Sequence, residues 1–483
     1  MLSSAFRQSS LSRDASRSLG EYHEATKHSV LSVQLDPNYV DSRTQPALYK
    51  CYPHFFRRFP LDPDQPLQQL LTQASAITYH KQYRDTVHLL RVQPSAGALY
   101  PTELYVQLRG IRGMLDGIYH LEPDTNTLTL LYELIDDGLE GYLPDSRLIT
   151  GCILLISCVY FRSSWKYKNR SLRYCFLDSG HHLGAVEAAA YVNSFPYQLL
   201  FEFDQQALNA DLGFENQEFV TAAVVIGEAK AKPVRRLRTP LPIVAGTDYF
   251  EPNRLIEAGY RQSFVDQSFV DQSVPLQPPP GLPRFPFPAA QWQEAIQQRR
   301  SARRFYPQPI EQAALLTIWA ALQQPVPGQP NAILEINAVV QRVAGLEPGL
   351  YRDGWTEAQR LKAGEFQDQT GFLCINQAIA RDSAVVFFIT ADWANYRVAL
   401  QQAGLIGQRI YLAATALGLG CSGIGAFYDD ETQAFLETEQ AVLYAVAVGQ
   451  VTGQATRQAT GQANSQTANQ PIALAPLPSS PNG

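Results

Sequence analysis

The chain has 483 residues, of which 45% are hydrophobic, 11% aromatic and 17% charged. At about 150 residues per domain, this length predicts roughly three units or two large ones, and the composition is that of a globular protein. The net charge of −6 leaves no electrostatic footprint for nucleic acid, and the longest apolar run, residues 153–161, is too short to cross a membrane. These properties argue against a nucleic-acid-binding protein and against a membrane protein.

The cysteines and the N-terminus bear on the compartment. Six cysteines are scattered along the chain, without a CxxC pair or a histidine at metal-ligand spacing. This spacing is typical of reduced, structural thiols, so we expect a cytoplasmic protein without a metal site. Residues 1–18 are rich in hydroxyl side chains and arginine but lack an apolar stretch, which argues against a secretory signal. A frayed terminus is the favoured interpretation, and a transit peptide is the alternative.

Two stretches rich in proline and glutamine divide the chain. Residues 262–288 cannot hold a regular helix or strand for long. Residues 451–483 lack the apolar content to order themselves. They predict a first half over residues 1–245, a linker over 246–289, a second half over 290–450 and a disordered tail over 451–483.

Each half shows the same succession of expected elements: a helix, a pair of strands, a further strand, a long helix and a last strand. In the second half, residues 292–300 are amphipathic, residues 336–340 alternate, residues 383–390 read as a buried strand, and residues 405–420 as a helix ending at glycine. The pattern predicts an α+β fold with one sheet in each half.

Four short similarities relate the two halves in the same order. The pairs are GIYH (117–120) with GLYR (349–352), Arg173 and Gly180 with Arg397 and Gly404, residues 222–227 with 445–449, and RRFP (57–60) with RRFYP (303–307). Their offsets fall from 246 to 222 residues along the chain, as short deletions would produce. We therefore expect an internal duplication, in which two sheet-and-helix halves form a pseudo-dimer within one chain.

The run RRSARR at residues 299–304 follows the amphipathic helix of the second half. A basic helix end is favoured by the helix dipole, which is the plainer interpretation. The alternative is a phosphate clamp, because guanidinium groups offer bidentate forks and a serine hydroxyl adds a donor to the same anion.

Two loops could lie against a flat ligand. PSAGALYP at residues 94–101 is either an ordinary turn or a loop whose small residues let a ligand approach the backbone. GIGAF at residues 423–427 is either a turn before a helix start or a set of backbone N–H groups exposed toward a ligand.

A lysine–tyrosine pair, Lys166 and Tyr167, stands in the segment WKYKNR. Such a pair is most often a solvated edge. In a closed cleft, the lysine charge would lower the pKa of the tyrosine and prepare it as a proton acceptor. The adjacent His181 and His182 point in different directions on a helix, so we do not expect them to share a metal ion.

Together these motifs resemble the FMN-dependent nitroreductase family and, within it, the SagB/ThcOx-type dehydrogenases, whose signature is similar to R-x-x-PSAGALYP-x-E-x-Y. Residues 91–105 match that signature throughout, residues 165–181 are similar to the branch's Lys-Tyr segment, and residues 22–29 to its N-terminal leader. RRSAR matches the family's flavin-phosphate motif, and GIGAFYDDE matches its loop beside the isoalloxazine ring. The resemblance covers residues 20–250 and 290–450.

The resemblance implies the fold of an α+β homodimer with two FMN sites, each taking its phosphate motif from one subunit and its Pro-Ser loop from the other. Here the first half has HFFRR (54–58) in place of RRSAR and FEFDQQ (201–206) near the place of GIGAF, while the second half has PVPGQPNA (325–332) in place of PSAGALYP. One composite FMN site is therefore expected, in a monomer with pseudo-two-fold symmetry. The cofactor-binding residues implied are Arg299, Ser301, Arg303, Pro94, Ser95, Ala96, Gly97, Ala98, Tyr100, Gly423, Ile424, Gly425 and Ala426.

By the same resemblance, the substrate is a peptide azoline or a related small molecule. Hydride would pass to flavin N5, Lys166 or Tyr167 would remove a proton, and dioxygen would reoxidise the flavin. Two alternatives stay open: an NAD(P)H-dependent reductase of nitro compounds or quinones, and a flavin-free, non-catalytic protein. The second half has WANY (393–396) in place of the Lys-Tyr pair, so the sequence leaves open whether the single pair lies in the composite site.

Overall fold

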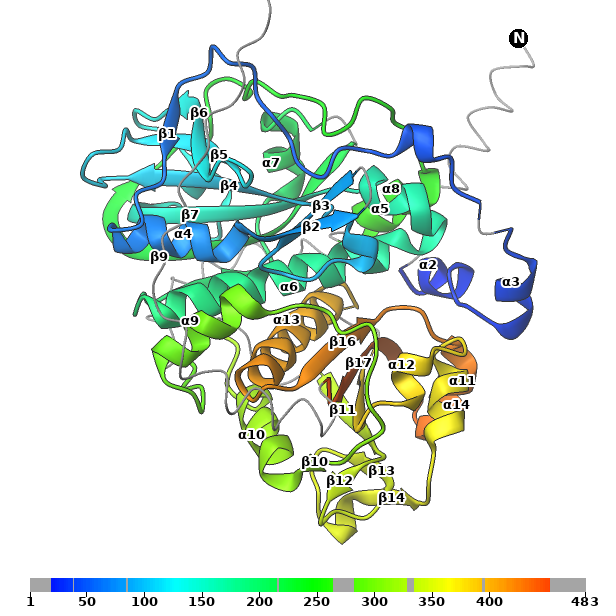
Figure 1. Ribbon diagram of the computed structural model, residues 1–483. Coiled ribbons are helices and arrows are strands. Elements are labelled where there is room, and N and C mark those ends of the chain that lie inside the picture. The colour runs from blue at the N-terminus through cyan, green and yellow to red at the C-terminus, as the bar shows by residue number, and fades with distance from the viewer. Residues whose placement is uncertain are drawn as a thin grey trace, which may run out of the picture.

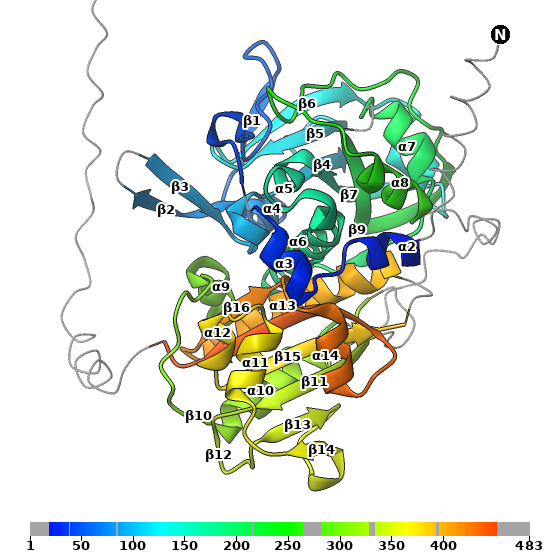
Figure 2. The ribbon, with the colours of Figure 1, turned by 90° about the vertical axis from the view of Figure 1, so that its right-hand side faces the viewer.

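The computed structural model describes residues 19–37, 39–83, 86–214, 217–263, 282–327, 334–392 and 396–451. The predicted frayed terminus, residues 264–281 of the predicted linker and the predicted disordered tail from residue 452 onward lie outside these residues, as do residues 328–333 and 393–395. Two large sheets, one from each half, lie on opposite sides of a pair of long helices (Figures 1 and 2). The predicted combination of helices with one large sheet in each half is confirmed.

The described part of the first half builds a seven-stranded antiparallel sheet in the order β1-β6-β5-β4-β7-β9-β8. One face packs on helix α6, and the other packs on the residues around helix α7. Both faces of the central strands are therefore buried, which explains their nearly continuous apolar sequence. The strands are β1 (Arg58–Pro60), β4 (Thr102–Arg109), β5 (Gly117–Glu122), β6 (Thr127–Glu133), β7 (Arg147–Val159), β8 (Gln198–Leu200) and β9 (Glu218–Pro233).

The other elements of the first half surround this sheet. A hairpin of β2 (Ile77–Tyr83) and β3 (Thr86–Arg91) projects from the body (Figure 2). Helix α8 (Arg254–Gln262) lies in the segment predicted as linker and packs on α6 of the first half. The remaining helices are α2 (Leu19–Ala25), α3 (Val30–Leu35), α4 (Pro66–Ser75), α5 (Phe161–Tyr167), α6 (Ser171–Val192) and α7 (Gln205–Asp211).

The described part of the second half builds a six-stranded antiparallel sheet in the order β14-β13-β11-β15-β17-β16. Its strands are β11 (Leu334–Val340), β13 (Gly349–Arg352), β14 (Arg360–Ala363), β15 (Val385–Ala391), β16 (Gly420–Ile424) and β17 (Ala441–Gly449). Its helices include α9 (Ala289–Gln298), α10 (Gln312–Leu322), α11 (Gln367–Leu373), α12 (Ala378–Arg381), α13 (Tyr396–Ala416) and α14 (Asp429–Leu436). Helix α13 begins nine residues before the predicted start and ends just before Gly418, which has a φ of +69°.

The two sheets carry their strands in the same order. Strands β6, β5, β4, β7, β9 and β8 of the first sheet correspond in chain order to β14, β13, β11, β15, β17 and β16 of the second. Three of the four sequence similarities fall on such corresponding elements: on β5 and β13, on α6 and α13, and on β9 and β17.

The fourth similarity, between RRFP and RRFYP, does not mark corresponding elements, so this part of the prediction is wrong. Arg58–Pro60 is strand β1 and pairs with β6 at one edge of the first sheet. In the second half, Ser301 bridges Cys421 and Tyr306 bridges Gln450, at the opposite edge of the sheet. A four-residue basic-aromatic match is short enough to arise without common structure, and its larger offset is consistent with that.

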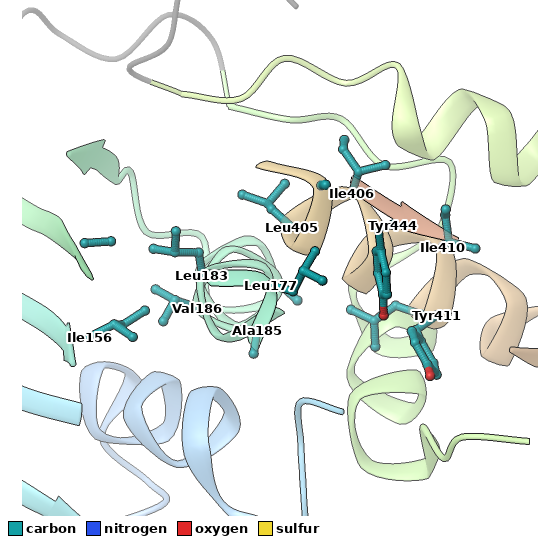
Figure 3. Packing of buried hydrophobic residues seen from close by; sticks show 14 of the residues in the cluster. Ile156, Leu177, Leu183, Ala185, Val186, Leu405, Ile406, Ile410, Tyr411 and Tyr444 are labelled. Carbon is teal, nitrogen blue, oxygen red and sulfur yellow. The ribbon is translucent and has the colours of Figure 1, made fainter. Parts of the chain in front are cut away.

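The two long helices cross with their backbones in contact. A Cβ atom on Gly180 of α6 would overlap the carbonyl oxygen of Gln401, and one on Gly404 of α13 would overlap the carbonyl oxygen of Leu177. Leu177 and Leu405 lie in one buried cluster at this seam (Figure 3). Gly180 and Gly404 are therefore needed where they occur, because any side chain would push the halves apart.

Each of the six cysteines lies in the described part of the chain as a free thiol, as predicted. A search of the described helices finds none that is both long and apolar enough to cross a bilayer.

Candidate active site

A cleft of about 860 Å³ lies between the two halves. The first half contributes the loop 94–97 and the start of its long helix, and the second half contributes residues 301–303 and the glycine loop 423–426. The predicted site residues that line it are Pro94, Ser95, Ala96, Gly97, Lys166, Tyr167, Ser301, Arg303, Gly423, Ile424, Gly425 and Ala426. The structure thus gathers motifs from both halves in one place.

Three predicted site residues do not line this cleft: Ala98, Tyr100 and Arg299. The Tyr100 hydroxyl accepts a hydrogen bond from the Arg91 backbone at 3.1 Å, inside the first half. Arg299 is buried, and its guanidinium donates to the backbone oxygens of Val92 at 2.6 Å and Arg91 at 3.0 Å. Arg299 therefore anchors the strand that leads into the Ser-Ala-Gly loop, and among the described residues its Nη1 has no hydrogen-bond partner.

The Lys-Tyr pair lies directly over the Ser-Ala-Gly loop. Gly97 has a φ of +63°, and a Cβ atom there would stand 2.8 Å from the Tyr167 hydroxyl and 3.4 Å from Lys166 Nζ. The sequence could not place this pair relative to the composite site. The structure brings both side chains to the cleft.

The expected effect of the lysine charge on Tyr167 is wrong. Burial, together with Tyr174 and Asp178, raises the pKa of Tyr167 well above its ordinary value, and Arg303 offsets this only in part. The ring of Tyr167 packs on that of Tyr174 with 4.6 Å between centroids. Because desolvation disfavours the phenolate, Tyr167 is a protonated phenol near neutral pH and can donate a hydrogen bond.

The glycine loop is shaped by two tyrosines. A Cβ atom on Gly423 would overlap the Tyr444 hydroxyl, and one on Gly425 would overlap the ring of Tyr174. The Gly423 backbone N–H donates to the Tyr411 hydroxyl at 2.7 Å, which lies 3.0 Å from Ser301 Oγ. Tyr411 therefore ties the RRSAR motif to the glycine loop.

The cleft wall carries two cations, Lys166 and Arg303. For Lys166 and Arg303 the structure shows no ion pair within the part of the chain it describes, and Arg303 is exposed. Unpaired cations at a cleft wall favour an anionic group of a ligand.

A buried charge cluster lies beside the glycine loop. The Asp429 carboxylate accepts hydrogen bonds from Arg170 at 2.7 Å and Arg173 at 2.6 Å, and from the His28 backbone at 2.8 Å. These arginines hold the pKa of Asp429 well below its usual range. Arg170 also donates to the Gly425 oxygen at 3.3 Å. The cluster fastens the N-terminal segment, the start of α6 and the glycine loop together.

Sequence reasoning missed several residues of the lining, namely Tyr174, Leu177, Asp178, His181, Ala302, Gln377, Ile379, Tyr411, Ser422 and Tyr444. Most of them stand on α6, α13 and β17, where an aromatic or polar side chain among apolar ones reads as core packing. The nearest signal was the polar sequence Asp178, Ser179, Gly180, His181 in the middle of an otherwise apolar helix.

The position on α6 that corresponds to Tyr411 of α13 has a different environment. Glu187 precedes Tyr411 by the same 224 residues that separate Gly180 from Gly404, yet it forms a buried ion pair with Arg409 at 2.7 Å. Arg409 also donates to the backbone oxygens of Gln324 at 2.6 Å and Pro325 at 3.0 Å. Tyr411 lines the cleft, whereas the corresponding residue Glu187 is engaged in a buried ion pair.

Comparison with known proteins finds a match to a protein family in the second half of the chain. Residues 296–450 match the model of the nitroreductase family. A crystal structure from Anabaena variabilis ATCC 29413, described as a candidate nitroreductase, superposes with a TM-score of 0.74 at 26% identity, covering 89% of this chain and 99% of that one. The superposition spans both halves, so the same arrangement of halves occurs there within one chain.

Two further matches are partial. A candidate nitroreductase of Methanocaldococcus jannaschii, MJ1384, is 31% identical over 94 residues, which is 18% of this chain and 46% of that protein. The chain thus spans less than half the length of this curated relative. The Escherichia coli microcin synthetase McbBCD complex, with truncated pro-MccB17 bound, matches with a TM-score of 0.29 at 17% identity, over 47% of this chain and 92% of that one. Residues 296–450 therefore match the nitroreductase family, in a chain whose described fold is similar to that of a candidate nitroreductase.

Proposed function

We propose that the chain is an FMN-dependent oxidoreductase with one composite flavin site. The observation that supports this most strongly is the cleft, which unites the Ser-Ala-Gly loop of the first half with the RRSAR and GIGAF motifs of the second. Each motif alone has a plainer explanation as a turn or a basic helix end. Their meeting around one cavity favours a shared ligand.

The lining is suited to FMN in both size and donor chemistry. A volume of about 860 Å³ lies in the range of ligand and cofactor pockets. Ser301 and Arg303 would hold the phosphate, since a hydroxyl and a guanidinium are strong donors to a dianion. Residues 94–97 and 423–426 would lie against the ring system, where small side chains allow close approach. When bound, FMN supplies two-electron redox chemistry that amino-acid side chains lack.

The proposed origin of the single site is a duplication that turned a homodimer into one chain. The matching strand order and the crossing of Gly180 with Gly404 support it. The second position would have lost its function, since the buried pair Glu187–Arg409 occupies the place of a cleft residue. A chain that already buries its dimer interface needs no second copy, so a monomer is expected.

The proposed branch is the SagB/ThcOx type, and the proposed substrate is a peptide azoline or a related small molecule. Residues 91–105 carry the branch's signature, and its Lys-Tyr pair lines the cleft over Gly97. In this proposal Lys166 holds and orients an electronegative substrate atom, while Tyr167 donates a hydrogen bond. Dioxygen is the expected electron acceptor.

An NAD(P)H-dependent nitro or quinone reductase is the second candidate, favoured by the nitroreductase-family domain itself. The two candidates differ in how fast a nicotinamide reduces the flavin. Rapid bleaching by NADH or NADPH would support the reductase, whereas slow bleaching combined with reduction by an azoline would support the dehydrogenase.

A pair of adjacent arginines provides the test of the flavin site. Arg303 lines the cleft, whereas Arg304 is exposed and stacks on Tyr306 with 5.6 Å to its ring centroid. Arg303→Ala should weaken FMN binding roughly 10- to 100-fold, as expected for lost hydrogen bonds to a charged group. Arg304→Ala should bind FMN like the wild type. Equal affinities in titrations of the two variants would contradict the proposed phosphate site.

A further inference from the structure

One buried carboxyl group in the described part of the chain forms no ion pair. Among the described residues eight acidic side chains are buried, and seven of them form ion pairs. The exception is Asp178, which is also the one acidic residue among those that line the cleft. The seven paired acids are Glu103, Glu122, Asp137, Glu140, Glu187, Glu218 and Asp429. Burying an unpaired carboxylate is costly, so this exception calls for an explanation.

Asp178 is held in place by the Ser-Ala-Gly loop. Its Oδ2 accepts a hydrogen bond from Ser95 Oγ at 2.6 Å, and its Oδ1 accepts one from the Ala96 backbone at 3.4 Å. Ser95 Oγ in turn accepts from the Tyr100 backbone at 2.9 Å, so its own proton is directed to the carboxylate. The carboxyl group is thereby fixed at the cleft wall where the two halves meet.

The groups that face Asp178 carry no charge near neutral pH. They are Tyr167 on α5, Tyr174 and His181 on its own helix, Cys158 on β7 and Tyr444 on β17. Burial raises the pKa of each of these phenols and of the thiol, and it lowers the pKa of His181 to about 3.

The charged groups across the cleft are the cations Lys166 and Arg303, and neither forms an ion pair with Asp178 in the structure. Burial raises the pKa of Asp178 to about 7, and the bonds from Ser95 and Ala96 limit the rise. Both protonation states are therefore accessible near neutral pH.

We propose that Asp178 is the residue that exchanges protons with a molecule bound in the cleft, and that Ser95 and Ala96 position its carboxyl group. In the exchange, an O–H bond forms on the carboxylate while the bond between the proton and its donor breaks, and the electron pair stays on the donor. Tyr167 cannot accept that proton, because it already carries its own. The inference deepens the proposed oxidoreductase function, which requires a proton-transfer group beside the redox centre, and rests on that function for the identity of the ligand.

The protonation of Asp178 can be measured on the purified full chain without any substrate. Aspartate carrying ¹³C in its carboxyl group is incorporated, and the carboxyl resonances are followed by NMR between pH 5 and 9. One resonance should titrate near pH 7 and be absent from Asp178→Asn. Asp430→Asn, which removes an exposed acid, should leave it unchanged. Ser95→Ala should raise the midpoint by about one pH unit, since a hydrogen bond to the charged form is lost.

Two results would overturn the inference. One is that every resonance that titrates near pH 7 in the wild type is still present in the spectra of Asp178→Asn. The other, decisive even if Asp178→Asn does not fold, is a midpoint that stays unchanged in Ser95→Ala. The titration does not depend on flavin, so a protein that binds no FMN but shows this resonance would contradict the proposed function and not the role of Asp178.

Discussion

The hydroxyl of Tyr167 lies against the Cα atom of Gly97, where a Cβ atom would stand only 2.8 Å from the hydroxyl oxygen. The contact joins the Lys-Tyr helix to the Ser-Ala-Gly loop within the first half. It explains why a glycine with a left-handed φ of +63° stands at the centre of that loop.

Gly97→Ala should therefore damage the site beyond the cost of backbone strain. The left-handed conformation costs an L-residue about 1–2 kcal/mol, and the new methyl group would also displace Tyr167 and Lys166. Gly113 is a matched control, because it has a φ of +82° but nothing within 4 Å of its Cβ position. Both alanine variants should lose similar free energy of unfolding to strain, while only Gly97→Ala should also lose more than tenfold in FMN affinity. Equal flavin affinities would show that the contact has no role in the site.

The close crossing of α6 and α13 predicts that Gly180→Ala destabilises the protein. A Cβ atom on Gly180 would overlap the backbone of α13, which cannot yield as a flexible side chain can. Overpacking typically costs about 1–3 kcal/mol, and we expect Gly180→Ala to reach at least the upper end. Gly371→Ala in α11 is the comparison, since its Cβ would stand 3.1 Å from the Cβ of Arg381 and should cost less than about 1 kcal/mol. Urea unfolding of both variants measures the difference, and similar midpoints would contradict the tight crossing.

The stability of the protein should fall in mild acid because of buried histidines. His182 is buried, its ring nitrogens have no hydrogen-bond partner among the described residues, and burial lowers its pKa to about 3. Above about pH 6.5 this group has no effect on the pH dependence of stability. As the pH falls from about 6.5 toward 3, the unfolded chain takes up a proton that the folded chain does not. Each such histidine therefore lowers the free energy of unfolding by up to about 1.4 kcal/mol per pH unit.

The measurement is the free energy of unfolding of His182→Leu against pH. The variant should become progressively more stable relative to the wild type as the pH falls below about 6.5. His54→Leu, at an exposed histidine, should show no such divergence. Parallel curves for His182→Leu and the wild type would refute the assignment of a neutral buried imidazole.

Variants of the buried pair Glu187–Arg409 test whether the pair serves the stability of the fold or the binding of a ligand. Removing one member of a buried pair typically costs about 3–5 kcal/mol, because the other charge is left uncompensated. Glu187→Gln should therefore destabilise the chain by about that much, and the double variant with Arg409→Gln should recover part of the loss. Neither residue lines the cleft, so FMN content should stay that of the wild type. A loss of flavin from folded Glu187→Gln would mean that this position still serves a ligand.

The sequence predicted those features that depend on local patterns. Apolar runs located the sheet strands. The family resemblance implied a common site for Gly97, Gly425 and Arg303, and these residues line one cleft in the structure. The corresponding glycines Gly180 and Gly404 were recognised in the sequence, and the structure explains them as the point where two backbones touch.

The features that escaped prediction depend on three-dimensional surroundings. The sequence motif suggests that Arg299 contacts a ligand, but its guanidinium donates hydrogen bonds to backbone oxygens of the first half. The pKa of Tyr167 follows from its burial rather than from its lysine neighbour. Asp178 could not be singled out, because the absence of a cation around it among the described residues is visible only once all buried acids are placed.

The measurement that tests the composite site most directly is the number of flavins per polypeptide. The purified chain is reconstituted with excess FMN, freed of unbound flavin, and the released flavin is counted against protein concentration. One FMN per chain, identified by its visible spectrum and lost on Arg303→Ala, is the result we expect. Two equivalent flavins per chain would contradict the loss of the second position, and none after reconstitution would contradict the proposed function altogether.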